Sequence, residues 1–318
     1  MIIKSLILLS ILFNVIGMDQ VSDKIDQSIV RQDMGGGHIV SASDSIINSL
    51  PEILPRPKIN SNAIKPAIYS KNYLLADPDS GIVFLKQEHK SRVPIASTTK
   101  IMTAIVVLEN YELDDIATIS STAANQIGAD AFLMTGEKIT IESLLNCLLI
   151  KSGNDSAYAL AEHMNQDGET GIEKFINKMN EKAAELGMRD TNYRDPAGLN
   201  TTGYSSAFDL YLATKYALKN PVFKEIVNKD KEVVTSIDKR YYHELNNSNR
   251  LVNEYQYPGA IGVKTGYMPE AGHCLVGATD RNGKKLISVI LNTYADTPSA
   301  SADESRKILD WGYANINW

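Results

Sequence analysis

The chain of 318 residues predicts a mixed α/β fold of the α+β type, in which a sheet is flanked by helices. Three observations indicate this class. Strand-forming runs occur over 67–85, helical patterns fill much of the middle, and further strand-forming runs near the end precede one last amphipathic helix. We therefore expect the elements in the order strands, helices, strands and a final helix.

The first two strands form a predicted hairpin. Residues 67–76 are rich in strand formers, the stretch 77–81 (Asp-Pro-Asp-Ser-Gly) is typical of a turn, and residues 82–85 form the second strand. A buried helix is expected over 101–108, because this run is almost entirely apolar and Pro94 stands just before its entry. The hairpin therefore leads into the first long helix.

Capping signals and apolar periodicity predict the remaining helices. Thr140 is a predicted N-cap for an apolar helix over 141–150, and Gly187 closes an amphipathic helix over 172–186. Five other segments share a helical pattern: 121–126, 156–164, 206–217, 221–227 and, at the end of the chain, 303–314. Strands return in the last third, where they are expected within 231–242 and over 261–267, 274–279 and 286–293.

Composition argues against several classes of function. Net charge is −6 and no basic run is present, so we expect no nucleic-acid partner. The five histidines are scattered without metal-ligand spacing, so neither a metal nor another cofactor is expected. Cys147 and Cys274 lie in apolar runs and are expected to be buried free thiols, with a disulfide between them as the alternative.

The N-terminus has the pattern of a secretory signal peptide. Lys4 is followed by about a dozen mostly apolar residues and then by Gly17, so we expect residues 1–17 to direct export. The apolar run is short for a membrane span, and an uncleaved anchor is the alternative. Residues 18–63 show no period and are rich in Gly, Ser, Asn and Pro, which predicts a linker before a folded domain over 64–318.

Ser97 and Lys100 are the first candidate catalytic pair. They are three residues apart at the start of an expected helix, so their side chains share one face. A neutral lysine amine can take the proton of a serine hydroxyl and activate it as a nucleophile, and the helix N-terminus favours developing negative charge. The same spacing at Ser236 and Lys239 lies in a polar stretch, so the pair alone is also compatible with a helix cap and a solvated lysine.

Two later stretches carry further candidate residues. Ser152 and Asn154 flank Gly153 at a corner between two expected helices, where they offer a hydroxyl and a carboxamide at a loop tip. Lys264 and Thr265 lie in an expected strand and are followed by Gly266, which lets a ligand approach the backbone closely.

The three motifs Ser97-x-x-Lys100, Ser152-Gly153-Asn154 and Lys264-Thr265-Gly266 are together similar to the signature of penicillin-recognising serine enzymes. Their spacing and flanks, including 195–199 (Asp-Pro-Ala-Gly-Leu), resemble the low-molecular-mass penicillin-binding proteins, which are serine-type D-Ala-D-Ala carboxypeptidases. The match covers roughly 64–318. It implies a penicillin-binding/β-lactamase-like transpeptidase fold, with a mainly antiparallel sheet flanked by helices and an all-helical lobe inserted after the Ser97 helix.

The resemblance implies a role for each catalytic residue. Ser97 would attack the peptide bond between two D-alanines at the end of a peptidoglycan stem peptide and form an acyl-enzyme, which water then hydrolyses. Lys100 would be the base, with its pKa lowered by burial and by the charge of Lys264. Ser152 would relay the proton to the leaving amine.

The same resemblance implies a set of substrate-binding residues. Asn154 would hold the substrate amide or Lys100, and Lys264 with Thr265 would receive the terminal carboxylate. Gly266 would allow close approach, and the backbone N–H groups of Ser97 and Tyr267 would form the oxyanion hole. The expected partners are stem peptides ending in D-Ala-D-Ala, and β-lactam antibiotics as covalent inhibitors.

Two departures from the family pattern stand out. The family often carries an arginine about ten residues before the Trp-Gly of the last helix, where this chain has Ser301; Arg281 and Arg306 are the candidate replacements. Many relatives also continue into a β-rich domain and an amphipathic anchor, whereas this sequence ends 54 residues after Lys264. We therefore expect one catalytic domain without a C-terminal membrane anchor.

Three alternative functions share parts of this signature. A D,D-endopeptidase that cuts peptidoglycan cross-links would use the same residues. A β-lactamase would typically need a Glu-x-x-Leu-Asn loop, and the nearest stretch, 197–200, lacks the glutamate. A non-catalytic peptidoglycan-binding module would be expected to lose Ser97 or Lys100, and both are present. The carboxypeptidase interpretation places the protein in the periplasm or cell envelope, with a role in cell-wall biogenesis and cell shape.

Overall fold

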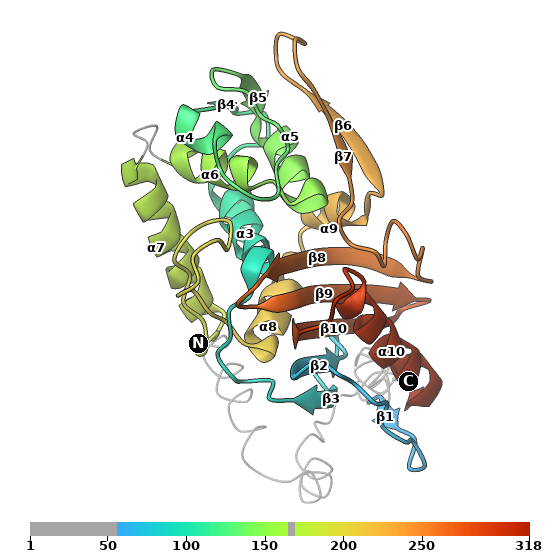
Figure 1. The fold of residues 1–318 in the computed structure, drawn as a ribbon. Helices are drawn as coiled ribbons and strands as arrows, with labels where there is room; N and C mark the ends of the chain where they lie inside the picture. The colour runs from blue at the N-terminus through green and yellow to red at the C-terminus, as the bar shows by residue number, and fades with distance from the viewer. Residues whose placement is uncertain (1–55, 165–168) are drawn as a thin grey trace, which may run out of the picture. The chain divides into compact units, whose positions relative to one another are not determined.

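A five-stranded sheet is the centre of the structure, a computed structural model that describes residues 56–164 and 169–318 (Figure 1). Its strand order is β3-β2-β10-β9-β8, and all neighbouring strands are antiparallel. The strands are β2 (Asn72–Ala76), β3 (Val83–Gln87), β8 (Ala260–Met268), β9 (Gly272–Arg281) and β10 (Lys284–Thr293). Strands from both ends of the described chain thus share one sheet, which confirms the predicted α+β class.

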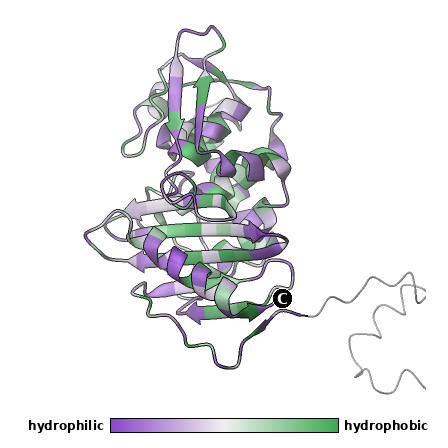
Figure 2. Ribbon diagram, turned by 90° about the vertical axis from the view of Figure 1, so that its right-hand side faces the viewer, coloured by the Kyte–Doolittle hydropathy of each residue, from purple (hydrophilic) through white to green (hydrophobic). Residues whose placement is uncertain are grey.

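Helices cover both faces of this sheet because its strands carry apolar side chains on both sides. Along β10, Leu286 and Ile290 pack with α10 (Ala300–Asn315), whereas Ile287 and Val289 belong to the larger core that includes α3 (Lys100–Asn110) and α8 (Ala207–Ala217). Alternate residues of a strand point to opposite faces, so one strand serves both cores. Figure 2 shows α10 lying across the strands, with hydrophilic and hydrophobic residues alternating along the helix.

A lobe inserted between α3 and α8 lies above the sheet in Figure 1. Its helical elements are α4 (Ser121–Ala124), α5 (Ile141–Asn146), a π-helical turn (Cys147–Lys151), α6 (Asn154–His163) and α7 (Glu169–Glu185). The lobe also contains two paired strands, β4 (Ile116–Thr118) and β5 (Lys138–Thr140), so the expectation of an all-helical lobe was wrong. These strands have three residues each, too few to produce a readable alternation.

Side-chain caps explain where several helices begin. Thr140 accepts the backbone N–H of Ser143 at 3.2 Å, as its predicted N-cap role requires. Ser206 caps α8 in the same way, and Asn220 caps α9 (Pro221–Asn228), where the proline occupies the first turn. The helix expected over 141–150 keeps α geometry only to Asn146 and then widens into the π-helical turn.

Part of the segment predicted as a linker, 18–63, belongs to the folded domain. Within the segment predicted as a linker, β1 (Lys58–Ile59) pairs with β11 (Ile316–Asn317) at the end of the described chain. The predicted signal peptide, 1–17, and residues up to 55 lie outside the described residues. The strand-rich section after α9 is the hairpin of β6 (Lys231–Thr235) and β7 (Tyr242–Asn246), and the strand expected from 67 begins only at Asn72.

The two cysteines are buried and unpaired, as their apolar surroundings predict. Burial raises the pKa of both thiols, which keeps them protonated and unreactive. The alternative of a Cys147–Cys274 disulfide was therefore wrong.

Candidate active site

Ser97 lies in a 3₁₀ turn, Ala96–Thr99, that runs directly into α3. The turn is tighter than the regular helix start expected from the sequence, because the backbone N–H of Thr98 bonds to the carbonyl three residues earlier, on Ile95; Ala96 adopts a left-handed conformation with φ +46°. The Thr98 hydroxyl anchors it by donating to the carbonyl of Ile95 at 2.7 Å. Lys100 is the first residue of α3, so the three-residue spacing still places its amine 2.9 Å from Ser97 Oγ.

Lys100 is fully buried and has three polar contacts. Its Nζ lies 2.9 Å from Ser97 Oγ, and it donates to Asn154 Oδ1 at 2.7 Å and to the Ala197 carbonyl at 2.9 Å. Burial lowers the pKa of Lys100 to about 7, against the opposing charges of Asp195 and Asp155. A neutral amine has two N–H donors and one lone pair. Asn154 and Ala197 can take both donors, which leaves the lone pair for the proton of Ser97.

Ser152 closes the π-helical turn in a left-handed conformation, with φ +70°. Its hydroxyl accepts a hydrogen bond from Lys264 Nζ at 2.8 Å, and Lys264 also donates to the carbonyl of Thr265 at 3.0 Å. Lys264 is fully buried, and its pKa is lowered well below its usual value by burial and then by the charge of Lys100. The expected charge effect between the two lysines therefore falls on Lys264, and burial is the main cause of the lowered pKa in both.

The third motif lies on β8, the edge strand of the sheet next to the 3₁₀ turn. A Cβ added to Gly266 would lie 2.9 Å from the backbone nitrogen of Ser97, so only glycine allows the strand to approach the nucleophile this closely. The Thr265 hydroxyl donates to Ser248 Oγ at 2.9 Å. Tyr267 follows at the rim, where its exposed ring packs on His273.

The loop 195–200 supports the nucleophile from below, a role that was missed in the sequence. The Asp195 carboxylate accepts four backbone N–H groups, those of residues 197–200, at 2.6–3.1 Å. Gly198 has φ +82°, and any Cβ there would collide with the carbonyl of Ala96. The loop thus carries the Ala197 carbonyl to Lys100 and fixes the turn that holds Ser97. Aspartate followed by proline and glycine is a known turn signal that could have indicated this role.

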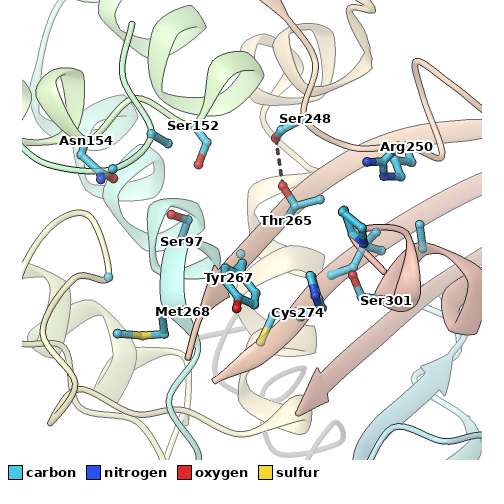
Figure 3. A pocket seen from close by; sticks show the side chains of 18 of the residues that line it. Ser97, Ser152, Asn154, Ser248, Arg250, Thr265, Tyr267, Met268, Cys274 and Ser301 are labelled. Carbon is cyan, nitrogen blue, oxygen red and sulfur yellow. Dashed lines mark hydrogen bonds between the residues drawn. The ribbon is translucent and has the colours of Figure 1, made fainter. Parts of the chain in front are cut away.

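These motifs border a groove of about 800 Å³ (Figure 3). Ser97, Ser152 and Asn154 lie on one side, and Thr265, Gly266 and Tyr267 form the strand beside them. Lys100 and Lys264 lie beneath the surface and do not line the groove. The structure therefore brings all eight predicted site residues together, six at the groove and two buried under it.

Arg281 and Arg306, the two arginines named from the sequence as candidate replacements, do not lie at the groove, whereas another arginine does. Arg281 lies over the rings of Tyr257 and Tyr313, and Arg306 lies over the ring of Tyr255; neither lines the groove. Both were therefore wrong as replacements at the site. Arg250, which no motif singled out, does line the groove.

Ser301 lines the groove too, as its register predicted. The second Ser-x-x-Lys pair, Ser236 and Lys239, lies in the β6–β7 connection outside the groove, where Ser236 donates to Asp238. Within residues 56–164 and 169–318, no three His, Cys, Asp or Glu side chains are placed to bind a metal.

Comparison with known proteins finds one family across most of the chain. Residues 59–295 match the family described as D-alanyl-D-alanine carboxypeptidase. The D-alanyl-D-alanine carboxypeptidase DacF of Bacillus subtilis is 33% identical over 77% of this chain, which spans 62% of that relative's length. A D-alanyl-D-alanine endopeptidase of Pseudomonas aeruginosa is 31% identical over 81% of this chain and 82% of its own length. The crystal structure of a Streptomyces DD-transpeptidase matches with a TM-score of 0.74 and 33% identity, covering 79% of this chain and 99% of that one.

Proposed function

Because this chain belongs to the D-alanyl-D-alanine carboxypeptidase family, we propose that it removes the terminal D-alanine from peptidoglycan stem peptides through an acyl-enzyme on Ser97. The observation that supports this most is the position of Lys100, fully buried with its Nζ 2.9 Å from Ser97 Oγ and its two other contacts on hydrogen-bond acceptors. That arrangement suits a neutral amine that takes a proton, which is what serine activation requires.

In the acylation step, Ser97 Oγ attacks the carbonyl carbon of the bond between the two D-alanines while Lys100 takes the hydroxyl proton. The carbonyl oxygen gains negative charge, which the backbone N–H groups of Ser97 and Tyr267 stabilise. The C–N bond then breaks. Ser152, hydrogen-bonded to Lys264, gives its hydroxyl proton to the departing amine and takes the proton held by Lys100 in its place, so D-alanine leaves as a free amine, Lys100 is neutral again and the shortened peptide stays as an ester on Ser97.

In the deacylation step, water attacks the ester carbonyl and gives its proton to Lys100. As the ester bond breaks, Lys100 returns that proton to Ser97 Oγ, and the stem peptide leaves one D-alanine shorter. A β-lactam would acylate Ser97 in the same way, but its leaving amine stays tethered to the acyl group. We therefore expect β-lactams to act as covalent inhibitors.

The same site can cut a cross-link, because the leaving amine then belongs to a second stem peptide. The 31% identity to a relative named an endopeptidase makes this the second candidate. Export to the cell envelope completes the proposal, supported by the signal pattern at 1–17. Within the part of the chain that the structure describes, no helix has the length and apolarity needed to span a membrane.

Labelling with a fluorescent penicillin tests the nucleophile and the class of enzyme together. We expect a stable covalent band on the purified protein and none on Ser97→Ala. A band that fades within seconds would favour a β-lactamase, and no band on well-folded protein would refute an active enzyme. Release of D-alanine from a model tripeptide, compared with cleavage of a cross-linked dimer, then separates carboxypeptidase from endopeptidase.

A further inference from the structure

The substrate of the proposed reaction ends in a carboxylate, and the residue expected to bind it does not face the groove. Lys264 is fully buried, does not line the groove, and directs its amine at Ser152 Oγ and the carbonyl of Thr265. A group held in this way orients the Ser152 hydroxyl. It does not present a positive charge to a ligand in the groove.

Three charged side chains line the groove: Lys151, Arg250 and Asp296. Lys151 immediately precedes Ser152, and its Nζ lies 5.9 Å from the centre of the Phe132 ring. Arg250 lies on the other side of the groove, beyond Thr265 and away from Ser152 and Asn154 (Figure 3). A substrate whose scissile bond lies at Ser97 and whose leaving group extends past Thr265 would therefore meet Arg250.

The turn that carries Arg250 is fixed to the threonine of the third motif. Ser248, two residues earlier, accepts the hydroxyl hydrogen of Thr265 at 2.9 Å and donates its own backbone N–H to the carbonyl of Ile150. Asn249 is fully buried, and its side chain accepts the N–H of Leu251 at 3.0 Å. Arg250 is thus held between ordered neighbours, and this limits the entropy lost when it binds a ligand.

The guanidinium has donors available for a second partner. Its Nη1 pairs with Glu254, whose side chain is 52% exposed, while the Arg250 side chain is 33% exposed. Such a pair is screened by water and contributes little, so a ligand carboxylate can share or replace it. A guanidinium has five N–H donors and binds a carboxylate in bidentate fashion.

We propose that Arg250 binds the C-terminal carboxylate of the substrate, with the Thr265 hydroxyl turning its hydrogen from Ser248 to the ligand, and so makes the enzyme selective for a free peptide end. This inference rests on the proposed function and assigns its specificity. Ser301 lies on the same side of the groove as Arg250 (Figure 3) and has a neutral side chain, so Arg250 supplies the cation for this wall.

The test compares two peptides that differ only at the C-terminus, one ending in D-Ala-D-Ala with a free carboxylate and one with a carboxamide. In wild-type protein the carboxylate peptide should be preferred. Arg250→Ala should lower kcat/KM for the carboxylate peptide roughly 10- to 100-fold, the loss expected for a hydrogen-bonded charge pair, and should leave the carboxamide peptide nearly unchanged. Arg250→Lys should give an intermediate loss, because an ammonium cannot bind in bidentate fashion.

Arg306→Ala is the matched control, because Arg306 is also paired with a nearby carboxylate and stacked on a tyrosine but lies outside the groove. It should leave the ratio of the two kcat/KM values unchanged. Equal losses on both peptides in Arg250→Ala and Arg250→Lys would show that the arginine only supports the fold, and no loss on either would likewise overturn the proposal.

Acylation by a penicillin and by its methyl ester gives a second readout with the same logic. It applies even if the wild-type protein releases no D-alanine, an outcome that would count against the proposed function and not against Arg250. A selective loss on the free penicillin in Arg250→Ala would support the proposal, and equal rates on acid and ester would overturn it.

Discussion

The pH dependence of acylation follows from the buried position of Lys100. Its pKa is lowered to about 7, mainly by burial, and only the neutral amine can accept the proton of Ser97. The acylation rate should therefore rise as pH increases through 7 and level off above it. The neutral fraction is roughly one tenth at pH 6, one half at pH 7 and nine tenths at pH 8, so the rate should rise about tenfold over these two units.

Stopped-flow labelling with a fluorescent penicillin measures this rate directly between pH 5.5 and 9. Lys100→Ala should reduce the rate roughly 10²- to 10⁴-fold, the usual contribution of a positioned base, and should abolish the rise near pH 7. His273 also lines the groove, but burial and then the charge of Arg250 lower its pKa, so it titrates at lower pH. His273→Gln should therefore keep the midpoint near 7.

A flat profile in the wild type would refute the assignment of Lys100 as a base that titrates near neutrality. A midpoint close to 10 would show that the amine keeps its ordinary pKa, and that burial in this site does not discharge it. A midpoint that moves in His273→Gln would transfer the titration to the histidine.

Two further predictions concern stability. Gly198→Ala should lower the free energy of unfolding by about 2 kcal/mol or more, because it adds a clash with the Ala96 carbonyl to the cost of a left-handed alanine. Gly136 has the same φ of +82° but lies in open space, so Gly136→Ala should lower the free energy of unfolding by only about 1 kcal/mol. Equal losses of the two variants in urea unfolding would contradict the close packing at Gly198. Burial pushes the pKa of His243 down, but the hydrogen bond and charge of Glu137 outweigh it and raise the pKa. The stabilisation by the His243–Glu137 pair is thus complete below the ordinary histidine pKa and is lost as pH rises through the raised value. His243→Gln should remove this contribution to the pH dependence of the free energy of unfolding, measured in urea between pH 5.5 and 8.5. An unchanged pH dependence in the variant would contradict the assignment.

The fold class and the enzyme family were predictable because each motif is short and local. Ser97 and Lys100 are three residues apart, and that spacing brings their side chains together in either a 3₁₀ turn or an α-helix. The family and fold expected from the three motifs are confirmed by the match over residues 59–295 and by the Streptomyces DD-transpeptidase structure. The assigned role of each site residue stays a prediction.

The residues on the side of the groove opposite Ser97 could not be predicted from short local motifs. Ser248, Arg250 and Ser301 come from a turn and from a helix more than fifty residues later, and only the folded sheet places them opposite Ser97. Arg281 and Arg306 were named from the sequence as the candidate replacements for the arginine that the family often carries at the position of Ser301. Both instead pack on tyrosine rings, since a guanidinium on an exposed face gains more from an aromatic neighbour than from open solvent.

The burial of Lys100 also bears on whether the site is catalytic or only binds peptide. A fall in pKa from 10.5 to about 7 corresponds to a cost on the order of 5 kcal/mol for holding the charged form in the folded state. The unfolded chain binds more protons between these two values, so this amine makes the protein less stable at neutral pH than at alkaline pH. A module that only bound peptidoglycan would gain stability by replacing Lys100 with an apolar residue. A second buried lysine, Lys264, adds to the same cost, so the pair is best explained by proton transfer at Ser97 and Ser152.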